Sequence, residues 1–144
     1  MLKSKTTESF GNTISLLWLF AILNVLFRDI HELTTASAIN EILSGTVNGN
    51  PVTEEVLFAA AFAVELLLLA FLFSSLLSPR AARMMNLFLA PLAIIGTVFG
   101  APGDPDDYFF AVVTTLTYAA IFILCWTWKP QKTSDLTGRV QHVS

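Results

Sequence analysis

The hydrophobic positions of the chain form four continuous runs, each long enough for a helix that crosses a membrane. Hydrocarbon about 30 Å thick needs roughly 20 helical residues. The runs predict helices at about 13–33, 53–77, 79–99 and 105–128. Because apolar residues follow one another without alternation, strands are not expected. The pattern therefore predicts an all-α membrane protein, an antiparallel bundle of four transmembrane helices. It forms one domain, residues 1–144, with a flexible tail at 131–144.

Local chemistry at the helix ends supports these limits. Thr53 can cap the second helix, and Pro79 and Pro105 each follow a cap residue at the first helical position of the third and fourth helices. The connection 34–52 is expected to contain a short amphipathic turn before the turn residues at 48–51.

The positively charged residues predict which side of the membrane each end occupies. Seven of the eight Lys and Arg residues flank the first and fourth helices or separate the second from the third: Lys3, Lys5, Arg80, Arg83, Lys129, Lys132 and Arg139. The connections 34–52 and 101–104 contain neither Lys nor Arg. Positive segments stay cytoplasmic, so both termini are expected inside, in the inner or plasma membrane. Arg80 and Arg83 are accordingly interpreted as topology anchors and contacts to lipid headgroups. Trp18 is expected near the cytoplasmic interface.

The amino-acid composition is typical of a protein surrounded by lipid, and it excludes several classes of function. The chain is 54% hydrophobic and 13% charged, against about 25% charged residues in a soluble domain. A net charge of −3 gives no basic surface, so nucleic acid is not an expected partner. The single cysteine excludes an internal disulfide. The histidines, His31 and His142, cannot both ligate a haem inside the bundle, and we expect no metal, no cofactor and no catalytic residue.

The polar residues of the first two helices are the first candidates for a site. Glu65 lies near the middle of the second helix, where a charged carboxylate costs about 2.5–3.5 kcal/mol. It is therefore expected to face the other helices and to be paired or protonated. Asn24 and Arg28 share a face of the first helix, and we expect Arg28 to pair with Glu65. Such a pair fits a proton- or ligand-responsive centre and equally a structural ion pair that determines helix docking.

The fourth helix carries a second polar stripe. Asp107, Thr114, Tyr118 and Cys125 fall at helical spacing on one face. Each also has a structural interpretation. Asp107 fits an acid in the first helical turn, Thr114 and Tyr118 fit interhelical hydrogen bonds, and Cys125 fits a small packing residue.

Several segments resemble an uncharacterised family of small prokaryotic four-helix membrane proteins. They are LWLFAILNVLFRDI, RAARMMNLFLAPLAIIG, DDYFFAVVTTLTY and the closing WTWK. The family pattern has an LW-x-F-x-x-LN opening followed by F-x-DI, a glutamate in helix two, R-x-x-R-x-x-N in helix three and an aromatic start to helix four. The resemblance implies importance for Asn24, Asp29, Glu65, Arg80, Arg83, Asn86, Tyr108 and Phe110. It supports the fold and implies no activity.

Arg28 lies outside that family pattern, which leaves a second arrangement open. In this alternative, Asp29 faces Tyr108 or Asp107 at the start of the fourth helix. The full set of candidate pocket residues is Asn24, Arg28, Asp29, Glu65, Asp107, Tyr108, Thr114 and Tyr118.

Three classes of function follow from these residues. The first is a protein that binds or moves a lipid or another small apolar or amphiphilic molecule, in a polar pocket in the outer half of the bundle. The second is a structural or accessory membrane subunit whose buried polar network holds no ligand. A membrane enzyme ranks last, because no nucleophile–base set or cofactor signature is visible. Membrane lipid is an expected partner, and a homo-oligomer is compatible with all three classes.

Overall fold

The computed structural model describes residues 5–47, 49–99 and 105–128. Within these ranges the chain forms helices and one short antiparallel ladder. The elements are α1 (Lys5–Glu32), α2 (Ala36–Leu43), β1 (Thr46–Val47), β2 (Asn50–Pro51), α3 (Glu54–Leu76), α4 (Pro79–Phe99) and α5 (Pro105–Thr127).

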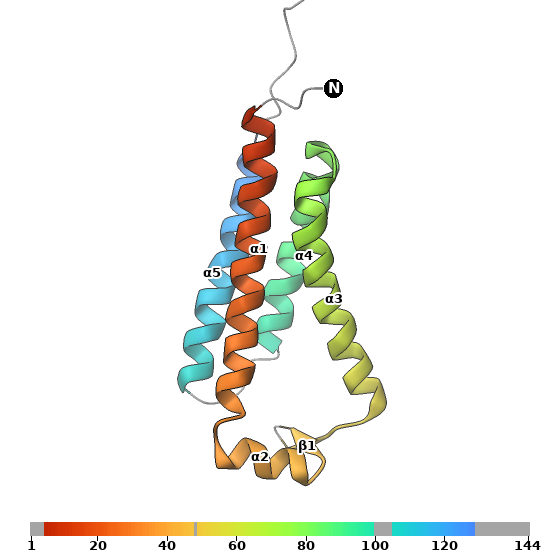
Figure 1. The fold of residues 1–144 in the computed structure, drawn as a ribbon, viewed down its shortest axis with the longest axis vertical. Helices are drawn as coiled ribbons and strands as arrows, with labels where there is room; N and C mark the ends of the chain where they lie inside the picture. The colour runs from red at the N-terminus through yellow and green to blue at the C-terminus, as the bar shows by residue number, and fades with distance from the viewer. Residues whose placement is uncertain (1–4, 48, 100–104, 129–144) are drawn as a thin grey trace, which may run out of the picture.

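Four helices are long and apolar enough to cross a membrane: α1, α3, α4 and α5. Each runs in the opposite direction to the long helix before it (Figure 1). Helix α1 packs against α3 and α5, and α4 packs against α5 and α3. We call the end that holds the start of α1 the terminal end, and the opposite end, which carries α2, the α2 end.

The structure differs from the sequence-based expectation at the start of α1 and in the connection after it. Helix α1 begins at Lys5 rather than near residue 13. The expected amphipathic turn is a complete helix, α2, whose N-cap Thr35 accepts a hydrogen bond from the backbone N–H of Ala38. The ladder pairs Thr46 with Pro51. The sequence does not predict this local hairpin, because two-residue strands leave no alternating pattern.

Several hydroxyl groups on the long helices bond within their own helix. Ser74 donates to the carbonyl of Ala70 at 2.6 Å, and Thr117 donates to the carbonyl of Val113 at 2.8 Å. Such bonds to the preceding turn remove the cost of placing a hydroxyl in hydrocarbon, where water cannot pair with it.

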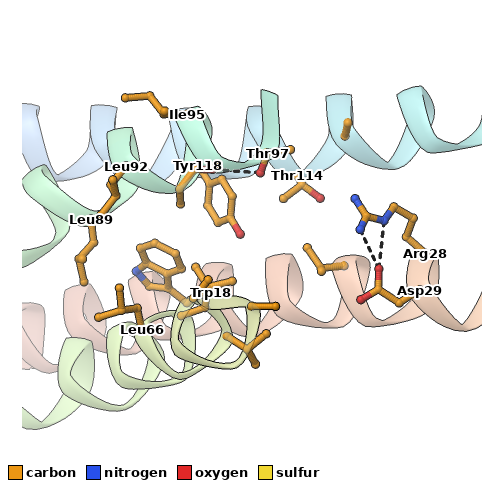
Figure 2. A pocket seen from close by; sticks show the side chains of 18 of the residues that line it. Trp18, Arg28, Asp29, Leu66, Leu89, Leu92, Ile95, Thr97, Thr114 and Tyr118 are labelled. Carbon is orange, nitrogen blue, oxygen red and sulfur yellow. Dashed lines mark hydrogen bonds and ion pairs between the residues drawn. The ribbon is translucent and has the colours of Figure 1, made fainter. Parts of the chain in front are cut away.

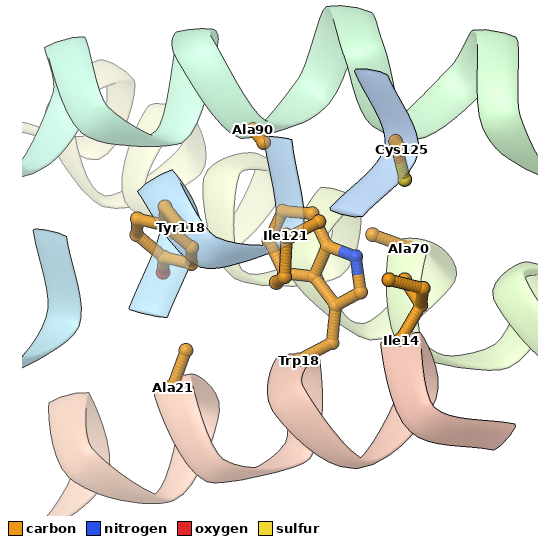
Figure 3. Packing of buried hydrophobic residues seen from close by; sticks show 8 residues of the cluster. All are labelled: Ile14, Trp18, Ala21, Ala70, Ala90, Tyr118, Ile121 and Cys125. Atoms are coloured by element: carbon orange, nitrogen blue, oxygen red, sulfur yellow. The ribbon is translucent and has the colours of Figure 1, made fainter. Parts of the chain in front are cut away.

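The core lies between α1, α5 and the terminal halves of α3 and α4 (Figure 3). Its members are Ile14, Trp18, Ala21, Ala70, Ala90, Tyr118, Ile121 and Cys125. Trp18 is the largest of them and is fully buried. Trp18 is therefore a core residue, and its expected place near the cytoplasmic interface stays a prediction. Its indole packs beside Tyr118, with ring centroids 5.2 Å apart.

Small residues bring α1 and α3 close together near the terminal end. A Cβ on Gly11 would lie 2.9 Å from the carbonyl oxygen of Ser74, and Ser15 donates to the carbonyl of Phe71 at 2.8 Å. Small residues allow this approach between membrane helices. Toward the α2 end, α3 leans away from α1 (Figure 1), and every residue from 53 to 65 is exposed.

Candidate functional site

A buried amide joins three helices at the terminal side of the candidate site. Asn86 on α4 is fully buried. Its Oδ1 accepts a hydrogen bond from Trp18 Nε1 on α1, and its Nδ2 donates to Ser74 Oγ on α3 at 3.0 Å. Nδ2 also donates to the carbonyl of Ala82 at 2.8 Å. This network positions the Trp18 ring, which forms one wall of the cavity described next.

A cavity of about 640 Å³ lies between the long helices in the half nearer the α2 end. Small side chains leave this space open, because they fill little of the volume between the helix axes. The small lining residues are Ala60, Ala63, Ala93, Gly96 and Ala111. Most of the other lining side chains are large and apolar, so the cavity suits the apolar part of a ligand.

Tyr118 supplies the main polar group inside the cavity. The residue is 1% exposed, yet its hydroxyl has no hydrogen-bond partner among the described residues. Figure 2 shows this hydroxyl pointing into the space between α5 and α1. No buried side-chain nitrogen or oxygen atom of the described residues lacks a partner, so the Tyr118 hydroxyl oxygen is accessible at the cavity surface and can bond to a molecule there. An acceptor or donor on a bound molecule would therefore be favoured at this position.

Thr114 also lines the cavity, but its hydroxyl is already engaged. Asn24 Nδ2 donates to Thr114 Oγ1 at 2.6 Å and to the carbonyl of Phe110 at 3.0 Å. Asn24 thus joins α1 to α5 and is not among the lining residues.

An ion pair within α1 lines the cavity near the α2 end. Arg28 Nη2 and Nε donate to Asp29 Oδ1 at 2.8 and 3.1 Å, as Figure 2 shows. The expected partner of Arg28 was Glu65, and the structure replaces it with the adjacent carboxylate. The pair is partly exposed, so it places charge at the edge of the cavity.

Glu65 points away from the cavity. At about 100° per residue, it lies on the face of α3 opposite Ala63 and Leu67, which line the cavity. Its side chain is exposed. The physical reason is the position of Glu65 around the α3 axis, which directs its side chain away from the other helices, and α3 also leans away from α1 in this half (Figure 1).

The start of α5 forms a contact with α1 that neither predicted arrangement included. The ends of α1 and α5 are joined by His31 Nε2 and Asp106 Oδ2, 3.1 Å apart. Asp107 is buried in the first turn of α5, and Tyr108 is 54% exposed. Neither is among the residues that line the cavity.

The arginines of α4 lie at the terminal end, far along the helix from the cavity. Arg83 Nε donates to the carbonyl of Cys125 at 2.8 Å and Nη2 to that of Trp126 at 3.3 Å. A cation that binds the last carbonyl groups of a helix also interacts favourably with its dipole. Arg80 is exposed.

The structure therefore unites part of the predicted site and adds residues to it. Arg28, Asp29, Thr114 and Tyr118 line one cavity, whereas the other four candidates do not. Sequence reasoning missed Trp18, Thr97 and the small residues of the lining. The spacing of Ala93 and Gly96 is the signal that could have indicated close approach or open space on α4.

The fold and the cavity define a small helical protein with four helices of membrane-spanning length. Residues 5–135 match the model of the Family of unknown function (DUF6326), and the chain belongs to that family. The comparisons with curated proteins and with solved structures gave no match.

Proposed function

We propose that this protein binds a small apolar or amphiphilic molecule within the membrane, in the cavity between its long helices. The observation that carries the proposal is the Tyr118 hydroxyl, which faces a cavity of about 640 Å³ and has no hydrogen-bond partner among the described residues. Small-molecule sites commonly have volumes of roughly 300–1,000 Å³ and combine apolar walls with few polar groups.

The membrane placement in this proposal follows from helix length and charge. The four long helices form an antiparallel transmembrane bundle, with the terminal end in the cytoplasm and the α2 end outside. Lys and Arg concentrate near the terminal end in the sequence and are absent from the 34–52 and 101–104 connections. The cavity then lies in the outer half of the bundle, in the inner or plasma membrane.

The chemistry of the lining favours a ligand with an apolar body and a hydrogen-bonding group. The apolar body would occupy the space beside Ala93 and Gly96, and the polar group would meet the Tyr118 hydroxyl. The Arg28–Asp29 pair offers a charged edge for a polar headgroup. A lipid or an isoprenoid-like molecule with a carbonyl or hydroxyl group has this combination.

Native mass spectrometry of the protein, purified in mild detergent, tests the proposal. We expect an adduct of constant mass on the wild-type chain and at least a several-fold smaller adduct fraction in Gly96→Leu. An added Cβ at Gly96 meets no atom within 4 Å. The leucine side chain can therefore begin there without a steric clash and extend into the cavity. Tyr118→Phe should also weaken binding, because it removes the hydroxyl that is proposed to bond to the polar group of the ligand.

Ala81→Phe is the matched control. It adds bulk at an exposed residue of α4 that does not line the cavity, so its adduct should equal that of the wild type. An adduct that persists unchanged in Gly96→Leu and Tyr118→Phe would show that the molecule binds elsewhere.

A structural or accessory subunit is the second candidate, and a specific observation favours it. Asn86 and Asn24 both use their amide groups to join helices. Such bonds hold membrane helices together and require no ligand. Absence of any adduct, together with loss of stability when Asn86 is replaced, would favour this function.

A further inference from the structure

Glu65 occupies the middle of α3, with equal numbers of helical residues before and after it. Its side chain is exposed and has no hydrogen bond or ion pair with another described residue. Because α3 is long enough to cross a membrane, this position falls near the centre of the hydrocarbon. Lipid tails offer no polar partner there. The described residues of its own chain therefore leave this carboxyl group without a partner.

The residues around Glu65 form a continuous stripe along α3. Phe58, Ala61, Glu65, Leu68 and Leu72 follow one another at alternating spacings of three and four, and all are exposed. We call these five residues the α3 stripe. The spacing is that of the a and d positions in helices that pack along their length. Ala61, one turn from Glu65, leaves room for a second helix to approach closely.

We infer that the α3 stripe is the contact between two copies of this protein, with Glu65 of one copy against Glu65 of the other. Two copies in one membrane are related by an axis along the membrane normal, so the same residue of both lies at the same depth. A protonated Glu65 donates its O–H to the carboxylate of the other copy. One shared proton then satisfies both groups and leaves a single charge between them.

A second copy is the occupant that these observations favour, because it brings the matching carboxyl group without any further component. Arg28 is bound by Asp29 on its own helix, and Arg83 is bound by carbonyl groups at the end of α5. Arg80 lies in the first turn of α4, at the terminal end, whereas Glu65 is at the middle of α3. A polar group at an a position also determines the register of two packed helices.

The α3 stripe and the cavity are independent features. Ala63 and Leu67 line the cavity on the face of α3 opposite Glu65, and Phe62 lines it from about 60° away. No residue of the α3 stripe is among the lining residues, so pairing and ligand binding use different side chains. Failure of ligand binding would not affect this inference, and failure of pairing would not affect the proposed function.

Disulfide cross-linking of the full chain in native membranes tests the inference. The variants carry Cys125→Ala, which removes the single native cysteine. Leu68→Cys places a thiol next to Glu65 on the stripe, and mild oxidation should give a disulfide-linked dimer, because the two Cβ atoms lie close across the axis. Ala61→Cys, on the other side of Glu65, should do the same and provides a second variant if the first does not fold.

Leu116→Cys is the matched control. Leu116 is the middle residue of α5 and is 65% exposed, so its thiol lies at a similar depth but outside the stripe. It should remain monomeric under the same oxidation. Equal cross-linking of Leu68→Cys and Leu116→Cys would indicate random collision and overturn the inference, as would a Leu68→Cys product formed only with a protein of different mass.

Substitution of Glu65 distinguishes specific pairing from apolar contact. In the Leu68→Cys background, Glu65→Leu should weaken association about 3- to 30-fold, the range expected for an interhelical hydrogen bond in a membrane. Glu65→Gln should retain most of the dimer, because two amide groups can both donate and accept. Undiminished dimer in Glu65→Leu would show that lipid or protonation alone satisfies Glu65.

Discussion

Asn86 is the residue whose hydrogen bonds we expect to contribute most to the free energy of unfolding. Its amide accepts from Trp18 and donates to Ser74 while being fully buried. The R-x-x-R-x-x-N segment drew attention to this asparagine, but no pattern within one helix identifies partners on two others.

Asn86→Leu should lower the free energy of unfolding in detergent by about 1–3 kcal/mol, because Trp18 Nε1 is left buried without an acceptor. Cys125 is fully buried and is the single cysteine. Its reaction with a thiol-reactive dye during heating therefore reports unfolding. Ser75→Ala is the control, since Ser75 bonds only within its own helix near the surface. If Asn86→Leu lowers the free energy of unfolding no more than Ser75→Ala does, this role of Asn86 is contradicted.

The charged residues show why a site cannot be assembled from residue types alone. Arg28 and Glu65 were matched because each needs a partner in hydrocarbon. That need is real, but Arg28 satisfies it with its neighbour Asp29. Tyr118 and Thr114 were placed inward from helical spacing, and both line the cavity. Spacing is a local property, whereas pairing depends on distances between helices.

At the scale of the element, the angle between α1 and α3 shapes the whole site. Gly11 allows the two helices to meet at the terminal end, and their separation at the α2 end leaves the cavity between them. The sequence predicts both helices from their apolar runs. It does not predict the crossing point, because glycine in a membrane helix has several uses.

Gly11→Ala should destabilise the protein by about 1–3 kcal/mol, because the added Cβ meets the backbone oxygen of Ser74 at 2.9 Å and the helices must separate. The reaction of Cys125 with the thiol-reactive dye during heating measures this loss of stability. Gly96→Ala is the matched control: its Cβ meets no atom within 4 Å, and alanine favours a helix by up to about 1 kcal/mol. If both variants lower the free energy of unfolding equally, the loss in Gly11→Ala does not come from a clash between α1 and α3.

Helix α2 shows a different limit of sequence reasoning. It has no buried residue, and Figure 1 places it across the α2 end of the long helices. Ile39, Ile42 and Leu43 are exposed on it. An amphipathic helix at this position fits the membrane interface, with its apolar side toward lipid. The amphipathic spacing was visible in the sequence, but its orientation relative to the other helices was not.

At the scale of the whole molecule, the proposed orientation makes a direct prediction. In a Cys125→Ala background, a membrane-impermeant maleimide added to intact cells should label Ser44→Cys, at the end of α2. Ser78→Cys, between α3 and α4, should react only after the membrane is permeabilised. Both serines are exposed, so a difference in labelling reports sidedness. The reverse result would place the termini outside.

The sequence by itself determined the four long helices, because hydrocarbon requires each spanning segment to satisfy its own backbone and to be apolar over a set length. That requirement acts on one segment at a time. Only the tertiary structure decided that Trp18 is a core residue, that Asn86 joins three helices, and that Glu65 faces outward. These outcomes depend on where small residues let helices meet and where the helices diverge, which is a property of several segments packed together.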